Sequence, residues 1–218
     1  MKILETAEMI GNHLKTFLPG KWDGKDCILK MKDAGARNWK QTEWIGWYFQ
    51  YLCEKHLPTI SMKIPGPKYG RPQFDGLLEI PWDFKAHAMN TSKHSIIVND
   101  SEAIAKGIKQ YGAIGLILAL GEVEYNDEKR TFQQWHNELK GGKSKYELDK
   151  ISRGAWSRLR KVSLNLQQIS IIRINDDTLV KCGTFQEGFR NSNGAPRRPK
   201  VLIDLEKIDE EILHIVEF

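Results

Sequence analysis

Apolar and polar positions recur along the chain with two periods, and these predict a series of helices and strands. Over residues 2–18 apolar side chains recur close to every 3.6 positions, which predicts an amphipathic helix that ends at Pro19-Gly20. A second, long helix is predicted over residues 38–56, where a row of aromatic side chains is assigned to core packing. The polar segment 21–37 between them is expected to be a connector.

Strand patterns follow the second helix. Residues 113–124 begin with a nearly continuous apolar run, as expected of a strand that is buried on both faces of a sheet. The expected order is a strand over 59–64, a hairpin around 75–86, a strand over 95–98, a helix over 102–111 and a strand over 113–124. This order predicts an α/β fold with a central mixed β-sheet flanked by helices.

The C-terminal part has a weaker pattern. Its expected segments are a helix over 129–139, a basic helix or helix–turn over 146–166, a strand over 167–175 that pairs with 178–182, and an irregular loop over 183–200. The tail 201–218 alternates apolar and acidic residues, so we expect a strand followed by a capping helix.

Composition narrows the class of protein. A chain of 218 residues can bury one sizeable core, and 40% hydrophobic with 28% charged residues is ordinary for a soluble globular protein. The N-terminal segment carries acids where a signal peptide carries bases, and the longest apolar run, around 113–120, is too short to span a bilayer. The three cysteines are scattered and odd in number, which favours a reducing compartment over a zinc cluster or a disulfide framework. We therefore expect a cytoplasmic protein without a membrane partner.

The charge is positive and unevenly distributed. A net charge of +5 and a pI of about 9.0 favour a polyanionic partner, because each phosphate that a Lys or Arg neutralises releases counterions. The basic residues cluster in 143–161 and 190–200, whereas the tail after Val201 is acidic. This distribution indicates a nucleic acid as the partner.

The candidate catalytic groups lie in and just before one expected strand. If residues 82–86 form a strand, its period of two places Asp83 and Lys85 on one face and the apolar neighbours on the other. Asp75 stands eight residues before Asp83 and can be brought alongside it by the preceding strand or turn. Two carboxylates can hold Mg²⁺, and a lysine can orient or help deprotonate a water, or offset charge on a phosphate. This combination suits phosphodiester hydrolysis.

An acid two positions before a lysine is a common triplet, and the alternative is a half-exposed strand without catalytic function. Three other such triplets begin at Asp23, Asp127 and Glu138. They fall in a glycine-containing loop and on polar helix faces, whereas Asp83 lies among strand-forming residues with a second acid upstream. This context favours the metal site.

These residues resemble the motif of the PD-(D/E)XK nuclease superfamily, which includes most type II restriction endonucleases. In that family an acid opens a β-hairpin, and an acid-x-Lys triplet lies on its second strand. The resemblance implies that Asp75 and Asp83 bind Mg²⁺ and that Lys85 orients or activates the attacking water. The proline that usually precedes the first acid is absent here, where Gln73 and Phe74 stand.

The resemblance also implies a glutamate on the preceding helix that points toward the metal. Glu43 is the best match and Glu54 is its competitor, while a solvent-facing acid is the alternative for either. His87 lies on the same strand face as Asp83 and is either a phosphate-contacting group or a structural histidine.

Basic and amide side chains elsewhere predict contacts with DNA. Lys68 and Arg71, in a Pro- and Gly-rich loop, are expected near the scissile phosphate. The loop 183–200 carries side chains whose geometry matches base edges, and its alternative is a mobile surface loop. The residues expected to bind DNA are Lys68, Arg71, Arg153, Arg158, Arg160, Gln186, Arg190, Asn191, Asn193, Arg197 and Arg198.

The sequence thus predicts a Mg²⁺-dependent type II restriction endonuclease that acts as a homodimer on a short, palindromic site in double-stranded DNA. We expect a single nuclease domain over 1–218, with its catalytic core at about 38–124 and a DNA-contacting elaboration at about 143–200. No nucleotide cofactor is expected, because Gly141-Gly142-Lys143-Ser144 lacks the glycine at position 137 and the strand that a P-loop requires. Two alternatives remain open: a non-catalytic sequence-specific DNA-binding protein, and a structure-specific or repair nuclease on the same core.

Overall fold

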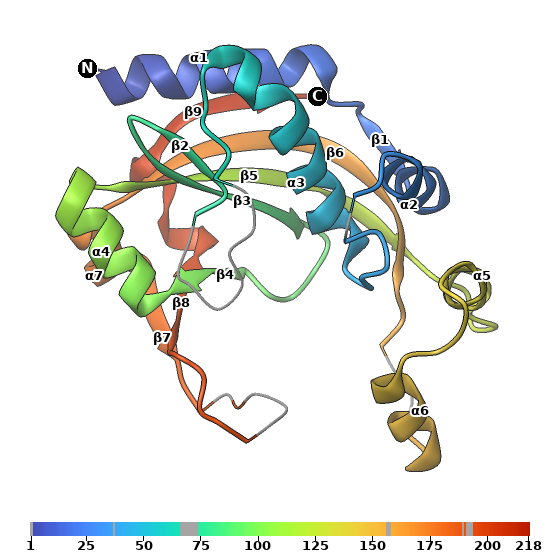
Figure 1. Ribbon diagram of the computed structural model, residues 1–218. Helices are drawn as coiled ribbons and strands as arrows, with labels where there is room; N and C mark the ends of the chain where they lie inside the picture. Colours follow the sequence, from blue (N-terminus) through green and yellow to red (C-terminus); the bar gives the residue numbers. More distant parts are fainter. Residues whose placement is uncertain (1, 37, 66–73, 156–157, 189, 191–193) are drawn as a thin grey trace.

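The computed structural model describes residues 2–36, 38–65, 74–155, 158–188, 190 and 194–218. A curled, six-stranded sheet lies at its centre (Figure 1). Its strands are β1 (Lys21–Asp23), β2 (Gly76–Leu78), β3 (Ile80–Ala88), β5 (Ile114–Tyr125), β6 (Lys161–Ile174) and β9 (Ile212–Glu217). The order is β1-β6-β5-β3-β2, and β9 pairs with a later part of the β6 edge that also holds β1. Strands β3 and β5 are parallel and the other pairs are antiparallel, so the expected mixed sheet is confirmed.

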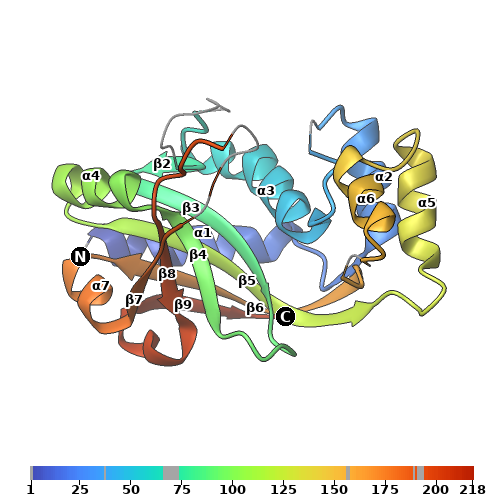
Figure 2. The ribbon, with the colours of Figure 1, turned by 90° about the horizontal axis from the view of Figure 1, so that it is seen from below.

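Helices and a smaller sheet cover the two faces of the central sheet (Figure 2). The small sheet has the order β4-β8-β7 and consists of β4 (Ser95–Asp100), β8 (Lys200–Asp204) and β7 (Gly183–Gln186). The helices are α1 (Lys2–Phe17), α2 (Gly24–Asp33), α3 (Trp44–His56), α4 (Ser101–Tyr111), α5 (Thr131–Leu139), α6 (Lys145–Ser152) and α7 (Asp176–Cys182). No helix in the described part of the chain is both long and apolar enough to cross a bilayer.

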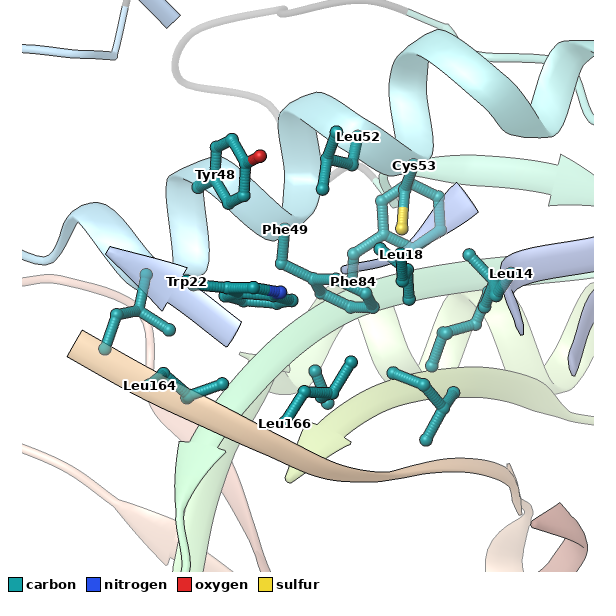
Figure 3. Close-up of a cluster of buried hydrophobic side chains, with 14 of the residues drawn as sticks. Leu14, Leu18, Trp22, Tyr48, Phe49, Leu52, Cys53, Phe84, Leu164 and Leu166 are labelled. Atoms are coloured by element: carbon teal, nitrogen blue, oxygen red, sulfur yellow. The ribbon is translucent and has the colours of Figure 1, made fainter. Parts of the chain in front are cut away.

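Two hydrophobic cores form, one on each face of the sheet. The first joins α1, α2 and α3 to the sheet, and Figure 3 shows Phe84 of β3 among side chains such as Phe49 and Cys53 of α3. The second joins α4 and the small sheet to the opposite face. Strand β5 serves both cores, since Ile117 belongs to the first and Leu116 and Leu118 belong to the second. The expected burial of this strand on both faces is confirmed.

Strand β6 contains a β-bulge that changes which face its side chains line. Leu120 of β5 is opposite Gln168, whereas the next residue, Gly121, is opposite Leu166, so Gln167 has no partner on β5. Even-numbered Leu164 and Leu166 therefore belong to the first core, and after the bulge the odd-numbered Ile169 and Ile171 do so. The bulge lets one long strand keep a continuous apolar surface toward the helices.

Several expected elements are present with altered ends. The helices over 2–18, 102–111 and 129–139 are confirmed as α1, α4 and α5. Helix α3 begins at Trp44, because Glu43 has a non-helical backbone (φ −88°, ψ 56°). The basic segment 146–166 is a helix only as far as Ser152, and β6 begins at Lys161. The β-branched and apolar alternation that starts there is a strand pattern that the basic residues obscured.

Other expectations were wrong for reasons of local capping and turn chemistry. The connector 21–37 contains β1 and α2, and the Asp23 carboxylate caps α2 by accepting hydrogen bonds from two backbone N–H groups. The segment 178–182 is helix α7, because Asn175 and Thr178 form a capping box. The strand expected over 59–64 is instead a 3-10 helix, Leu57–Ile60.

The C-terminal segment was also mispredicted in part. The loop expected over 183–200 starts with β7, which pairs with β8. The capping helix expected in the tail is absent from the described residues 201–218, which contain β8, two short 3-10 helices (Leu205–Lys207 and Asp209–Glu211) and β9. Strand β9 exists because it completes the exposed edge of β6, a tertiary contact that the local pattern does not report.

Candidate active site

A tight hairpin, β2 to β3, brings the two aspartates together. Leu78 pairs with Ile80, so Glu79 alone forms the turn and adopts a left-handed backbone (φ 61°). Its carboxylate lies 3.2 Å from Lys2 Nζ and accepts a hydrogen bond of 3.0 Å from the Thr6 hydroxyl, both on α1. Helix α1 therefore holds the hairpin turn in place.

Strand β3 separates polar from apolar side chains as its alternation predicts. Trp82 and Phe84 lie in the core beneath α3, and Phe84 is seen there in Figure 3. Asp83 and Lys85 point to the opposite side, where their neighbours in the parallel strand β5 are Leu116 and Leu118. The strand thus presents an acid and a lysine next to each other on one face.

Asp75 is clamped against β3 by its main chain and its side chain. Its backbone N–H donates to the Trp82 carbonyl over 2.9 Å, and its Oδ2 accepts from the Phe84 N–H over 2.9 Å. The atoms that hold Asp75 therefore belong to the residues on either side of Asp83. This places both carboxylates at one site, as the sequence predicts.

Asp83 and Lys85 form a close ion pair. Lys85 Nζ lies 2.5 Å from Asp83 Oδ2, and Asp83 is only 2% exposed. Burial, and then the nearby Asp75, raise the pKa of Asp83 to about 8 although Lys85 opposes this shift. Burial alone would lower the pKa of Lys85, but the two aspartates outweigh it and raise that pKa above the ordinary value. Lys85 is consequently held as an ammonium ion rather than as a free base.

The donor set of this site fits a hard divalent cation with retained waters. Asp83 Oδ2 is buried and, apart from its ionic contact with Lys85, receives no hydrogen bond from the described residues. The Lys85 ammonium contacts this oxygen from one side, and a carboxylate oxygen has a second lone pair with which it can bind a metal ion. Among the residues that the structure describes, no three carboxylate, imidazole or thiol groups converge as a metal cage. Mg²⁺ fits such a sparse site, since it is commonly bound through one or two carboxylates and keeps several waters.

The acid on α3 that lies beside the aspartates is Glu54, not Glu43. The Gln50 amide donates to Glu54 Oε1 over 2.7 Å and to Asp75 Oδ1 over 3.3 Å, so Gln50 bridges the two acids. Glu43 stands eleven residues before Glu54, a rise of about 16 Å along a helix, and it lines a different cavity together with Arg160. The expectation for Glu43 was therefore wrong in position. Helical periodicity allows either glutamate to face the site. The position of Asp75 along the axis of α3, next to Gln50, is what distinguishes them.

His87 continues the polar face of β3 beyond Lys85. One of its ring nitrogens, Nε2, lies 2.8 Å from the Lys93 carbonyl oxygen. Burial lowers the pKa of His87, as do the charges of Lys161 and His94. Burial therefore favours the neutral form of the ring, which is held by the chain that follows β3.

Arg160, expected on the DNA, belongs instead to a buried polar network between α5, α6 and β6. It is 8% exposed, and its Nη2 lies 3.5 Å from Glu147 Oε2 while Nη1 lies 3.2 Å from His136 Nδ1. Glu147 Oε1 also accepts hydrogen bonds from the side-chain amides of Gln133 (2.5 Å) and Asn137 (2.9 Å). A guanidinium so enclosed cannot reach a phosphate outside. The sequence analysis missed the burial of Arg160, because the number of basic residues in a segment does not show which of them are buried.

The other basic candidates are divided between exposed and paired groups. Arg153, Arg158, Arg190 and Arg197 are exposed. Arg198 is engaged by acids at the start of α4, since its Nε lies 3.0 Å from Glu102 Oε2. This ion pair makes Arg198 a link between the loop and α4.

The remaining candidates lie at or beyond the limits of the described chain. Gln186, at the end of β7, is half-buried, and its Oε1 has no hydrogen-bond partner among the described residues. Lys68, Arg71, Asn191 and Asn193 lie outside the described residues.

Comparison with known proteins gives one remote likeness. No family model and no curated protein sequence matches the chain. Among solved structures it is similar to the restriction endonuclease BglI bound to its DNA recognition sequence, with a TM-score of 0.37 and 8% identity over 80% of this chain and 72% of that chain. A likeness of this size does not establish a shared activity, so the side chains of the site carry the functional assignment.

Proposed function

We propose that this protein is a Mg²⁺-dependent endonuclease that hydrolyses phosphodiester bonds of double-stranded DNA. The supporting observation is the convergence of Asp75, Asp83 and Lys85 at the β2–β3 hairpin, with a buried carboxylate oxygen left without a hydrogen bond. Two carboxylates and an ammonium group match the needs of a reaction in which charge grows on a phosphate.

The residues of the chain have distinct roles in this proposal. Asp75 and Asp83 hold Mg²⁺, and the bound ion supplies Lewis-acid stabilisation of the phosphate charge. Gln50 and Glu54 fix the orientation of Asp75 through the hydrogen bonds at 3.3 and 2.7 Å. Lys85 orients the attacking water and offsets the charge on the non-bridging oxygens. Its raised pKa argues against a role as the proton acceptor.

The proposed reaction is an in-line displacement at phosphorus. The water oxygen forms a bond to phosphorus while the bond to the 3′ oxygen of the sugar breaks. The attacking water gives up a proton to solvent and the leaving 3′ oxygen takes one from solvent, so the products are a 5′-phosphate and a 3′-hydroxyl.

We further propose that the enzyme is a type II restriction endonuclease that acts as a homodimer on a short palindromic site. The motif resemblance supports this class, and a two-fold symmetric dimer matches a two-fold symmetric site. The loop between β7 and β8 carries exposed Arg190 and Arg197, whose side-chain type pairs with guanine edges in the major groove.

Digestion of plasmid DNA tests the proposal. We expect discrete fragments with Mg²⁺, none with a chelator, and recovery of cutting when Mg²⁺ is restored. A salt-dependent gel shift without any cleavage would identify a non-catalytic DNA-binding protein. Cutting confined to branched or nicked substrates would identify a structure-specific nuclease.

A further inference from the structure

A second site adjoins the catalytic one at the far end of β3. A groove begins at His87 and Ala88, directly beyond Asp83 and Lys85 on the same strand. The chain that connects β3 to β4 forms one side, and the residues before and at the start of β6 form the other. In Figure 1 the connection from β3 to β4 and helix α6 lie on the same side of the central sheet.

The groove collects cations from separate parts of the chain. Lys93 comes from the β3–β4 connection, Arg158 from the segment before β6, and Lys161 from the first position of β6. Among the described residues none of these three forms an ion pair, and Lys93 and Arg158 are exposed. Convergence of two parts of the chain that are far apart in sequence, Lys93 and the stretch 158–161, distinguishes this groove from an ordinary solvated face of one helix.

Acidic side chains do not cancel this charge. Apart from the buried pair of Glu147 and Arg160, the lining contains one carboxylate, Glu43, against the side chains of Lys93, Lys150, Arg158 and Lys161. Glu147 is consumed by Arg160 and two amides in the buried network. Hydroxyl groups also line the groove, from Thr42, Thr91, Ser95, Tyr125 and Ser144. The groove therefore presents a positive, hydrogen-bonding surface that suits phosphate oxygens.

The distance to the catalytic site fits one continuous nucleic-acid strand. Four residues separate Asp83 from His87, and at about 3.3 Å per residue of strand this spans about 13 Å. Successive phosphates of one DNA strand advance about 3.4 Å along the helix axis, so the groove lies about four nucleotides from the scissile phosphate.

We propose that Lys93, Arg158 and Lys161 form a binding site for the phosphodiester backbone of the DNA that is cut, within about four nucleotides of the cleaved bond. This inference rests on the proposed function and names where the substrate lies beyond the reacting group. It assigns the positioning of the strand to the β3–β4 connection and the start of β6, rather than to the buried Arg160.

The test compares a groove variant with a charge-matched control. The groove variant is Lys93→Gln/Arg158→Gln/Lys161→Gln, and the control is Lys15→Gln/Lys30→Gln/Lys55→Gln, which removes three exposed cations of α1, α2 and α3. Both are placed in an Asp83→Asn background so that binding is measured without cutting. The probe is a labelled duplex that carries a cleaved sequence, or a mixed-sequence duplex if no cleavage is seen.

The readout is the salt dependence of affinity. Each lost phosphate contact lowers the slope of log K against log salt by about 0.9, so the groove variant is expected to lose about 2 to 3 units of slope while the control keeps its slope. Ethylation of phosphates within about four nucleotides of the cleaved bond is expected to block binding of the parent and not of the groove variant. Equal slopes in the two variants, or no salt-dependent binding at all, would overturn the inference.

Failure of the inference is distinguishable from failure of the proposed function. If the wild type does not cut DNA but the groove variant loses slope, the phosphate-binding site is supported and the nuclease activity is refuted. If the wild type cuts DNA and the slopes of the two variants do not differ, only the phosphate-binding site is refuted. Circular dichroism checks that both variants are folded.

Discussion

Two clusters of ionisable residues, each around a buried carboxylate, can be compared within this molecule. One contains Asp75, Asp83 and Lys85 on the hairpin, and the other contains Glu147, Arg160 and His136 between α5, α6 and β6. In the second cluster, hydrogen bonds from two amides and the charge of Arg160 lower the pKa of Glu147, although burial alone would raise it. In the first, burial raises the pKa of Asp83 to about 8, and one of its oxygens accepts no hydrogen bond from the described residues.

Under the proposed function, this difference in hydrogen bonding separates a carboxylate that stabilises the fold from one that binds a ligand. A buried carboxylate whose hydrogen bonds are satisfied stabilises one arrangement of the chain and offers nothing to a ligand. A buried carboxylate that is left unsatisfied opposes folding, and such groups are concentrated at sites that bind or react. Both clusters contain a basic residue close to an acid, so hydrogen-bond satisfaction, not the presence of charge, distinguishes them.

The largest effect is expected at Asp83. Asp83→Asn should reduce the rate of DNA cleavage by at least about 1000-fold, because a charged ligand at the reacting phosphate is lost. Cleavage rate is measured on a plasmid substrate, and DNA binding, measured by gel shift, should remain. Cutting at the wild-type rate would refute the assignment of the site.

The same variant should not be less stable at neutral pH without metal. The folded-state pKa of Asp83 is raised, so its unfavourable contribution is absent below the unfolded pKa near 4 and grows as pH rises toward 8. Urea titrations at pH 7.5 should give Asp83→Asn a free energy of unfolding equal to or above that of the wild type. Added Mg²⁺ should stabilise the wild type and not the variant.

In the cluster around Glu147, by contrast, replacing the acid should lower the stability of the protein. Glu147→Leu leaves Arg160 buried without its partner and should destabilise the protein by about 3–5 kcal/mol. The double variant Glu147→Leu/Arg160→Met should recover much of this loss. Denaturant unfolding measures both, and at temperatures where the single variant is folded it should still cut DNA. A negligible effect on stability would show that the network contributes little.

The pH dependence of the unfolding free energy should show a contribution from His136. Burial, and then the charges of Lys140 and Arg160, lower the pKa of His136 to about 4, even though the hydrogen bond to the Trp39 carbonyl opposes the shift. A neutral histidine is favoured in the folded state, so its contribution is complete above pH 6.5 and is lost as pH falls toward 4. The loss should amount to at most about 3 kcal/mol. His136→Gln should flatten this part of the unfolding profile, and an unchanged slope would contradict the interpretation.

The smallest effect distinguishes the two acids of α3. Glu54→Gln and Gln50→Leu should each weaken Mg²⁺ binding by about 10- to 100-fold, because they release Asp75 from its bridge to the helix. Glu43→Gln is the matched control and should leave Mg²⁺ affinity unchanged. Isothermal titration with Mg²⁺ measures this without cleavage. An effect of Glu43→Gln larger than that of Glu54→Gln would reverse the assignment.

The sequence was most informative where local pattern and packing agree. The alternation around Asp83 correctly separated the face of Asp83 and Lys85 from the core face of Trp82 and Phe84. The choice between Glu43 and Glu54 could not be made from periodicity, since it depends on where Asp75 lies along α3. The burial of Arg160 was hidden for a related reason, as its partners come from two other helices.

The bulge at Gln167 lets β6 carry one residue more than its regular partner strand. Without that residue Leu166 and Gln168 would be neighbours, opposite the adjacent Gly121 and Leu120, and strict alternation would still place Ile169 and Ile171 toward the helices. The bond lost would be the one that the Gln167 carbonyl accepts from the N–H of Phe218, just after β9, over 2.9 Å. Loss of this one exposed glutamine should therefore cost less stability than loss of Ser170, which would turn Ile171 to the opposite face.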